Sequence, residues 1–326
     1  MTTQPFTTPI LFITFNRPEH TKVVMERIRS INPRILYVFQ DGARDGCEED
    51  IQRCKQVRSI INDYSADSST NIFTFYSTEN LGCGPGPAAA ISWFFEHEDK
   101  GIIIEDDAVP DKSFFSFAEV MLDKYKDDSN IRAIGSMHLD NRTFGDGSYY
   151  FSMMNRTFCA WATWRRAWKD FDYYHRGISR AILNDKLKDY NCPLRMREYW
   201  CERMEEIQKD AYHDSSWDQQ FWISIWIHNG KGVMPNVNLC KNIGFDEYGT
   251  HTTDSSCCAA NKDTSALTKI IEPSSQKIIT KADVRFQKLY FESYNYGLSG
   301  IKRLPLRINK RIKRLVNHQG SWIKKK

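Results

Sequence analysis

The chain has 326 residues, of which 41% are hydrophobic, 26% charged and 13% aromatic, and its formal net charge is +4. This composition matches a soluble globular protein with a packed core and excludes wholesale disorder. No apolar run approaches the roughly 18 residues that a membrane-spanning helix needs.

Short apolar runs alternate with helical patterns along the N-terminal third of the chain. Strands are predicted over Pro9–Phe15, Ile35–Phe39, Asn71–Tyr76 and Ile102–Ile104, with helices over Glu19–Ile31, over Glu49–Ile61 and around Trp93, the last after a glycine-rich turn at Gly82–Gly86. This alternation predicts an α/β fold of the Rossmann-like type, with a mostly parallel mixed sheet and helices on both faces.

The pattern changes beyond Pro110. The predicted order is a helix over Phe114–Tyr125, a strand over Ile131–Ser136, an aromatic-rich stretch over Tyr149–Tyr174, helices up to His228, a strand over Val233–Leu239, a loop or linker over Ser255–Thr264 and a helical tail from Ala282. We therefore expect a catalytic domain over residues 1–255, with a nucleotide-binding half (1–110) and an acceptor-binding half (111–255). Residues 256–326 are expected to form a linker and a basic amphipathic helical tail.

Polar residues follow each of the first four predicted strands: Asn16 and Arg17, Asp41, Asn80, and the triplet Glu105-Asp106-Asp107. Because ligands of parallel sheets bind at the carboxyl ends of the strands, one crevice is expected to collect them. The triplet could instead cap the next helix or form a solvated loop. Its position after the fourth strand favours a site for Mn²⁺ or Mg²⁺, because these metals bind carboxylate oxygens. A metal held there would stabilise the negative charge of a diphosphate leaving group.

The order of PILFITFNRPEH, FQDGARDG, NLGCGPG and IIIEDDAVPD resembles the nucleotide-binding half of GT-A glycosyltransferases. It is particularly similar to the family of the N-acetylglucosaminyltransferase that initiates complex N-glycan branching, whose metal motif is an EDD followed closely by Pro-Asp. The resemblance is good over residues 9 to 115, thinner to about residue 252, and does not cover the tail.

This resemblance implies roles for individual residues of the first half. Asp107 would be the direct metal ligand, while Glu105 and Asp106 face the ribose and the sugar. Arg17 would contact the nucleotide or its phosphates, and Asp41 the base or ribose. Each of these last two residues has an alternative, because Arg17 precedes a proline at a helix start and Asp41-Gly42 is a common turn.

Glycine in the segment Asn80-Leu-Gly-Cys-Gly suits a sharp turn or a close approach of the backbone to a ligand, so Asn80 and Gly82 are assigned to the nucleotide-sugar site. The segment matches the dinucleotide-binding GxGxxG pattern poorly. Pro85 and Pro87 also interrupt that pattern, which argues against an NAD enzyme.

The second half is expected to supply the general base and further ligand contacts. Asp218, in SSWDQQF, resembles the base of inverting relatives, with Asp214 the next candidate and an N-cap as the structural alternative. His251, in GTHT, resembles a late-loop histidine that binds metal or diphosphate, although a lone histidine is more often exposed or structural. In CAWATWRRAW, helical spacing of the tryptophans favours core packing, and Trp161 is the member expected to face a sugar.

The basic tail, roughly residues 300–326, interleaves apolar residues with arginine and lysine, which suits contact with an anionic membrane surface near a lipid-linked acceptor. A solvated basic helix is the alternative, and nucleic acid is disfavoured because the body has no basic motif. Nine cysteines without CxxC pairs, and an N-terminal segment without a basic n-region, predict a cytoplasmic protein, with the inner membrane face as a further expectation.

The predicted function is metal-dependent transfer of a sugar, with inversion, from a nucleotide-diphosphate donor such as a UDP-sugar to a saccharide or lipid-linked acceptor. One rival is a nucleotidyltransferase, which usually carries a glycine-rich, lysine-containing loop after its first strand, where this chain has Asn16-Arg17-Pro18. The other rival is a non-catalytic sugar-binding protein on a transferase scaffold.

Overall fold

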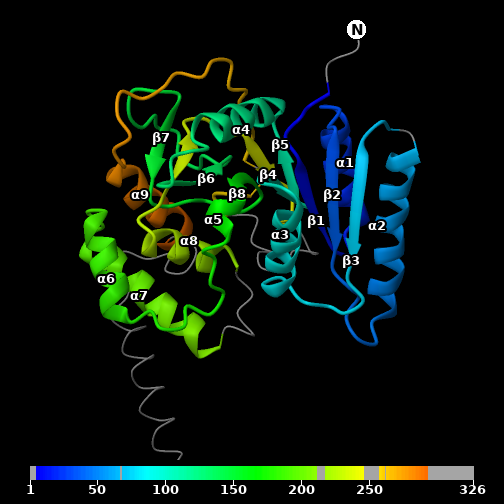
Figure 1. Ribbon diagram of the computed structural model, residues 1–326, viewed down its shortest axis with the longest axis horizontal. Helices are drawn as coiled ribbons and strands as arrows, with labels where there is room; N and C mark the ends of the chain where they lie inside the picture. The colour runs from blue at the N-terminus through cyan, green and yellow to red at the C-terminus, as the bar shows by residue number, and fades with distance from the viewer. Residues whose placement is uncertain (1–4, 67, 211–216, 246–256, 261, 293–326) are drawn as a thin grey trace, which may run out of the picture.

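The computed structural model describes residues 5–66, 68–210, 217–245, 257–260 and 262–292. These residues build an eight-stranded sheet with the order β3-β2-β1-β4-β8-β6-β9-β7, and a two-stranded sheet of β10 and β5. Figure 1 shows the sheet running through the middle of the molecule between layers of helices.

The strands are β1 (Ile10–Thr14), β2 (Ile35–Gln40), β3 (Asn71–Tyr76), β4 (Lys100–Glu105), β5 (Ala108–Pro110), β6 (Ile131–Gly135), β7 (Tyr149–Ser152), β8 (Ala160–Trp164), β9 (Lys231–Pro235) and β10 (Cys240–Asn242). The helices are α1 (Pro18–Arg29), α2 (Glu48–Ala66), α3 (Pro85–His97), α4 (Lys112–Lys124), α5 (Arg165–Trp168), α6 (Arg180–Asp189), α7 (Leu194–Lys209), α8 (Asp218–Ile227), α9 (Thr280–Phe286) and the π-helix η1 (Gln287–Glu292).

Strands β1, β2 and β4 of the first half are buried on both faces. Along β1, Ile10 and Phe12 pack with residues of α1, α2 and α4, whereas Leu11 and Ile13 pack with residues of α3, α5 and α8. Successive side chains of a strand point to opposite faces of the sheet, so one continuous apolar run fills two cores. The predicted α/β fold, with helices on both faces of the sheet, is confirmed.

Strands β3, β2, β1 and β4 are parallel, and β6 is parallel to β9. Between these groups β8 runs antiparallel to both β4 and β6, and β7 runs antiparallel to β9. Two successive antiparallel pairings restore the direction, so β6 and β9 end at the same edge of the sheet as β1 to β4. Both halves of the chain therefore contribute residues to one edge, which we call the carboxyl edge.

The helical interpretation of CAWATWRRAW is wrong over most of its length. Trp161 and Trp164 lie on β8, and only Trp168 lies on the short helix α5. All five residues of β8 are buried. A fully buried strand lacks the alternation of apolar and polar residues, so its sequence cannot be distinguished from that of a buried helix. The short strands β5, β7 and β10 were also not predicted.

The segment from residue 262 to residue 292 packs along the second half of the body. Ile271 exchanges hydrogen bonds with Ser148, and Phe286 and Phe291 are part of the larger core. Residues 262–277 form no helix or strand and Ile271 is 48% exposed, whereas Ala282, Phe286 and Phe291 of α9 and η1 are buried. The expected boundary after residue 255 and the basic tail lie outside the described residues, and both stay predictions.

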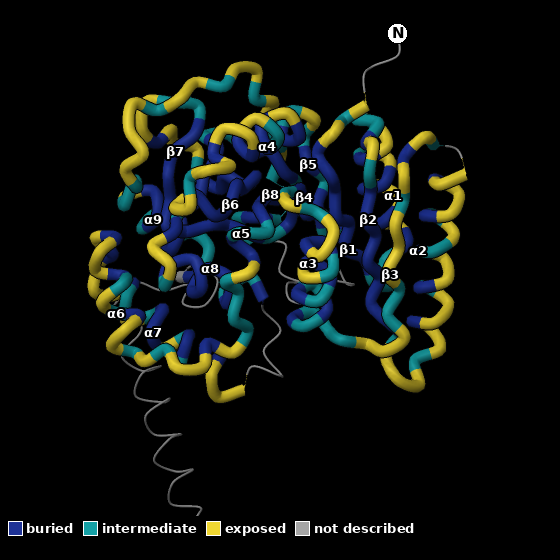
Figure 2. Tube along the Cα trace, viewed as in Figure 1, coloured by how far each residue is buried: buried dark blue, intermediate teal, exposed yellow. Residues whose placement is uncertain are grey.

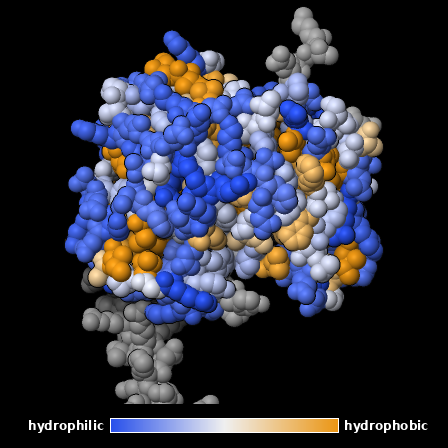
Figure 3. Space-filling model, in the orientation of Figure 1, coloured by the Kyte–Doolittle hydropathy of each residue, from blue (hydrophilic) through white to orange (hydrophobic). Residues whose placement is uncertain are grey.

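Burial decreases toward the β3 edge of the sheet, whereas β7 at the other edge is buried. Figure 2 shows dark, buried strands at the centre and a largely exposed β3, on which Phe73 is 48% exposed. Figure 3 shows a mostly hydrophilic visible face with separate apolar patches, one of them over α6 and α7, where Ile182 and Leu194 are exposed. Within the described residues, no helix is long and apolar enough to cross a membrane.

Candidate functional site

The parallel register brings the ends of the first strands together at the carboxyl edge. Ile13 of β1 lies opposite Glu105 of β4, and Thr14 lies opposite Gln40 of β2. Each strand ends in or leads within four positions into the predicted polar residues. These residues therefore lie at one edge of the sheet, and a crevice that collects them stays a prediction.

Arg17 joins β1 to the acidic triplet. Its Nη2 pairs closely with Asp106 Oδ1, its Nε lies 3.3 Å from Asp106 Oδ2, and its Nη1 lies 3.3 Å from Asp107 Oδ2. The Asp106 side chain is only 4% exposed and that of Arg17 15%, so the contact is largely shielded from water. A guanidinium thus neutralises both carboxylates, and the predicted contact of Arg17 with phosphate stays a prediction.

Asp107 lies between β4 and the small β5–β10 sheet. Its backbone oxygen accepts from the amide of Ile243 at 2.8 Å, and a Cβ on Gly244 would lie 2.2 Å from Asp107 Oδ2. Glycine at position 244 is therefore required for Asp107 to keep this position. Asp107 Oδ1 is buried and has no hydrogen-bond partner among the described residues. An unpartnered carboxylate oxygen is costly to bury, which is consistent with a cation ligand.

Glu105 connects the triplet to the second half of the chain. Its amide donates to the carbonyl of Cys159 at 2.9 Å, and its Oε2 lies 3.4 Å from the amide of Cys159. Burial, followed by the negative charges of Asp107 and Asp218, raises the pKa of Glu105 well above its ordinary value. The structure thus places Asp218, the first residue of α8, within electrostatic reach of the triplet.

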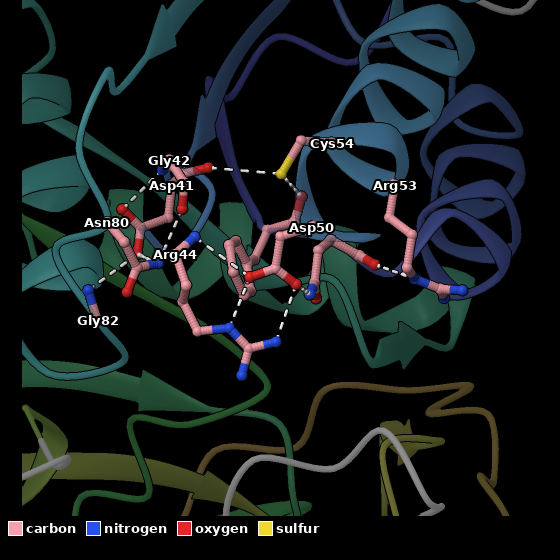
Figure 4. A network of polar contacts seen from close by, with 10 residues as sticks. Asp41, Gly42, Arg44, Asp50, Arg53, Cys54, Asn80 and Gly82 are labelled. Carbon is pink, nitrogen blue, oxygen red and sulfur yellow. Dashed lines mark hydrogen bonds and ion pairs between the residues drawn. The ribbon is translucent and has the colours of Figure 1, made fainter. Parts of the chain in front are cut away.

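Asp41 is the centre of a network that fixes the turn after β3 (Figure 4). Its Oδ1 accepts from the amides of Gly42 at 2.9 Å and Leu81 at 2.8 Å, and its Oδ2 accepts from the amide of Gly82 at 2.9 Å. Asn80 Nδ2 donates to Asp41 Oδ2 at 3.1 Å. Burial raises the pKa of Asp41, while the three amides lower it. Asp41 therefore holds the loop with both oxygens, and its contact with base or ribose stays a prediction.

A second network beside it involves two residues that were not predicted (Figure 4). Asp50 of α2 is buried and accepts from Asn16 Nδ2 at 2.6 Å and from Arg44 Nε at 2.5 Å. The hydrogen bonds from Arg44 hold the pKa of Asp50 well below its usual range. The Arg44 side chain is 63% exposed, so this anchored cation faces solvent. In sequence, Asp50 is one of several acids at a helix start and carries no separate signal.

Trp161 does not reach the surface. It is fully buried, its ring lies 5.5 Å from that of Trp217, and its Nε1 has no hydrogen-bond partner in the described part of the chain. Core packing accounts for this side chain in the structure, and its contact with a sugar stays a prediction. Asp214 and His251 lie outside the described residues.

The described residues contain no group of three His, Cys, Asp or Glu side chains arranged to hold a metal ion. A divalent metal that shares its shell with a diphosphate and water needs only one or two protein carboxylates. Asp107, with its unpartnered oxygen, meets that smaller requirement, and Asp106 is already occupied by Arg17. The residues present therefore fit a metal that arrives together with a nucleotide diphosphate.

No family profile and no curated protein sequence matches the chain. Among solved structures, HddC from Yersinia pseudotuberculosis is 12% identical, with a TM-score of 0.32 over 50% of this chain and 80% of that one. A 4-diphosphocytidyl-2C-methyl-D-erythritol synthase from Anaerococcus prevotii is 12% identical, with a TM-score of 0.32 over 50% of this chain and 73% of that one. A UDP-glucose pyrophosphorylase in complex with UDP-glucose is 9% identical, with a TM-score of 0.31 over 50% of this chain and 78% of its own.

With TM-scores of 0.31 to 0.32, these likenesses carry no conclusion about the fold or the activity of this chain. They do not distinguish a glycosyltransferase from a nucleotidyltransferase, since one fold can host unrelated chemistries. The particular similarity to the N-acetylglucosaminyltransferase family is not among these matches and stays a prediction.

Proposed function

We propose that this chain is a metal-dependent glycosyltransferase of the GT-A class, which transfers a sugar from a nucleotide-diphosphate donor, such as a UDP-sugar, to a saccharide hydroxyl with inversion. The observation that supports this most directly is the meeting of Glu105-Asp106-Asp107, Arg17 and Asp218 at one edge of the sheet. A donor diphosphate needs positive charge beside it, and an acceptor hydroxyl needs a carboxylate. One edge supplies groups for both.

On the donor side, Asn16, Arg44 and the loop of Asn80 and Gly82 surround the ends of β1 to β3. Because Asp41 and Asp50 hold these groups with their own hydrogen bonds, the loop and the cation are positioned before a ligand arrives. We propose that they bind the nucleotide. We also propose Trp161 as a sugar contact. This contact requires the Trp217 ring, which covers Trp161, to move away from it.

Mn²⁺ or Mg²⁺ bound here would act as a Lewis acid toward the leaving diphosphate. We propose Asp107 as its ligand and His251 as a further contact. Arg17 already touches Oδ2 of Asp107, so its guanidinium can turn from that oxygen to a diphosphate oxygen while it keeps its bond to Asp106. Glu105 and Asp106 would then face the ribose and the sugar.

Asp218 is proposed as the general base. It accepts the proton of the acceptor hydroxyl while that oxygen attacks the anomeric carbon and the bond to the diphosphate breaks on the opposite face. As the first residue of α8, Asp218 lies at a helix N-terminus, which favours the ionised carboxylate. Asp214 is the second choice for this role.

The substitution Asp218→Asn tests this assignment. We expect unchanged affinity for the donor and a loss of sugar transfer, measured as hydrolysis of a UDP-sugar when water is the acceptor, of about 10²- to 10⁴-fold. Asp170→Asn, which alters a carboxylate paired with Arg132 away from the edge, should keep the rate of the unmodified protein. Equal rates for both variants would remove Asp218 from the mechanism.

Two rivals make different predictions. A nucleotidyltransferase would release pyrophosphate from a nucleoside triphosphate and a sugar phosphate; we expect none, because β1 leads to α1 through Phe15-Asn16-Arg17 without a glycine-rich, lysine-containing loop. A non-catalytic binding protein would bind a UDP-sugar but show no metal-stimulated hydrolysis.

For the acceptor, we propose a saccharide or lipid-linked saccharide, met at the cytoplasmic face of a membrane through the basic tail. The support is the interleaving of apolar and basic residues over 300–326. In a liposome flotation experiment with anionic vesicles, the full chain should float with the lipid and a chain truncated after Tyr296 should not. Equal recovery of the two would reject membrane attachment.

A further inference from the structure

The large sheet ends on one side in a strand whose outer backbone groups are unpaired. This strand is β3, which pairs only with β2, and Asn71 N donates to Arg34 O at 2.9 Å at its start. Because backbone groups alternate in direction along a strand, the outward N–H and C=O groups are those of Ile72, Thr74 and Tyr76. Among the described residues, none forms a backbone hydrogen bond with these outward groups.

The opposite edge of the sheet is covered. There the segment that precedes α9 runs along β7, so that Ser148 N donates to Ile271 O at 2.8 Å and Ile279 N donates to Phe151 O at 2.9 Å. Phe151 and Ile278 also form a parallel bridge. In the described part of the chain, β3 is therefore the edge of this sheet that is left for pairing with another strand.

The sequence of β3 carries none of the features that usually prevent such pairing. Most edge strands are protected by charged side chains, particularly lysine, by proline or by bulges. Residues 68–78 contain no charged residue, no proline and no glycine, and β3 pairs with β2 in an unbroken register. A copy of this strand would therefore meet no repulsive charge along its length.

Two aromatic rings of β3 are partly exposed on the face of the sheet that α3 covers. Phe73 is 48% exposed and Phe75 is 37% exposed. The ring of Phe73 stacks on that of Tyr37 at 5.0 Å, and the ring of Phe75 lies 5.5 Å from that of Trp93 of α3. Because these contacts hold both rings in place, covering their exposed parts would gain hydrophobic free energy at little cost in side-chain order.

We propose that β3 binds a second copy of this chain, by pairing antiparallel with its own counterpart about a two-fold axis at Thr74. In this register Thr74 lies opposite Thr74 of the other copy and Ile72 lies opposite Tyr76, so the outward groups of all three residues are paired. Phe73 then lies opposite Phe75 in a non-hydrogen-bonded pair, where side chains approach most closely. This inference does not depend on the proposed function.

The covered edge at β7 limits this assembly to two copies. A two-fold interface uses the same strand of both copies, so the pairing closes and no open edge remains for a third. The interface consists of one pair of strands and the exposed rings beside them, which is small and typical of a reversible association. We therefore expect a dimer that dissociates on dilution.

The test is sedimentation velocity of the full chain at concentrations from about 1 to about 100 µM. The mean mass of the unmodified protein should rise from that of one chain toward that of two. Thr74→Lys should stay monomeric throughout, because two lysines would lie opposite each other at the axis. The matched control is Thr268→Lys, at an exposed threonine next to Leu267, whose amide donates to Ser113 of α4. It should associate like the unmodified protein.

Thr74→Glu completes the test. Alone it should also stay monomeric, whereas an equimolar mixture of Thr74→Lys and Thr74→Glu should recover the dimer, because opposite charges then face each other. This recovery requires both variants to be folded, and thermal unfolding checks each of them separately.

Three results would each overturn the inference: an unmodified protein that is monomeric at every concentration, a dimer that persists in Thr74→Lys, or a mixture of the two charged variants that stays monomeric. The first would leave the β3 edge to an extended segment of another protein. None of them bears on the proposed function, which is tested by nucleotide-sugar binding.

Discussion

Among single residues, Arg17 connects the end of β1 to two carboxylates of the acidic triplet. The sequence predicts that Arg17 lies at the carboxyl edge and contacts a nucleotide or its phosphates. In the structure it lies at that edge and contacts Asp106 and Asp107. A strand end can be predicted from a run of apolar residues. Which of its polar neighbours will pair with one another depends on geometry across strands that are far apart in sequence, as Arg17 and Asp106 are.

Arg17→Met should destabilise the protein, because it leaves the buried Asp106 carboxylate without its cation. We expect a loss of about 3 kcal/mol in the free energy of unfolding, measured with urea. The double variant Arg17→Met with Asp106→Asn should recover most of this loss, since no unpaired charge remains.

The control is Arg142→Met. The Arg142 side chain is 66% exposed and lies 3.9 Å from Asp140, so its removal should cost less than about 1 kcal/mol. If the two single variants were equally stable, the contact between Arg17 and Asp106 would not exist in solution.

At the scale of elements, the glycine-containing turn after β3 is held by contacts within the fold, before any ligand binds. Asn80 and Gly82 could be predicted as a sharp turn from their residue types, and Gly82 has a φ of 81°, which favours glycine. That Asp41 of the neighbouring strand end would bind the turn through the amides of Leu81 and Gly82 could not be predicted, because backbone donors leave no signature in sequence.

Asp41→Asn should loosen this turn. An asparagine side chain offers one acceptor oxygen in place of two, so some of the loop amides lose their partner. We expect a loss of about 1 to 3 kcal/mol in stability and amide hydrogen exchange at Leu81 and Gly82 that is faster by roughly tenfold or more. Asp263→Asn, at a side chain that is 92% exposed, should change neither. Unchanged exchange at both amides in Asp41→Asn would show that the carboxylate does not hold the loop.

Over the whole molecule, the two halves are joined through β8, which pairs with β4 on one side and β6 on the other. The alternation of strands and helices in the first half made its parallel sheet predictable. The second half was harder to predict, because its short buried strands have no periodicity and because β8 inserts antiparallel between β4 and β6. The packing of α9 and η1 on the body depends on a few buried residues within a polar stretch.

One of these residues, Asp283, should make the stability of the protein depend on pH. It is fully buried, accepts from Ser152 Oγ at 2.5 Å, and burial raises its pKa to about 6 from 3.8. Between these values the folded state binds more protons than the unfolded state. The free energy of unfolding should therefore fall as the pH rises from about 4 to about 6, by at most about 3 kcal/mol from this group, and stay level above that.

Asp283→Asn should remove this contribution, so that the difference in stability between the variant and the unmodified protein changes across this pH range and is constant above it. Urea unfolding at intervals of pH measures the difference. Asp263→Asn should follow the unmodified protein throughout. A constant difference between Asp283→Asn and the unmodified protein from pH 4 to pH 7 would contradict the raised pKa.

The central claim is that the carboxyl edge binds a nucleotide sugar together with a divalent metal held by Asp107. The most direct measurement is calorimetric titration of the full chain with a panel of nucleotide sugars, with and without Mn²⁺, for the unmodified protein, Asp107→Ala and Gly244→Ala. The glycine variant leaves every charge in place but would put a Cβ 2.2 Å from Asp107 Oδ2. Asp123→Ala, at a side chain that is 61% exposed, is the control for loss of a carboxylate elsewhere.

We predict Mn²⁺-dependent binding of one UDP-sugar that is lost in Asp107→Ala, weakened in Gly244→Ala and kept in Asp123→Ala. Binding that is equal in all four proteins, or no binding of any nucleotide sugar with or without Mn²⁺, would contradict the account.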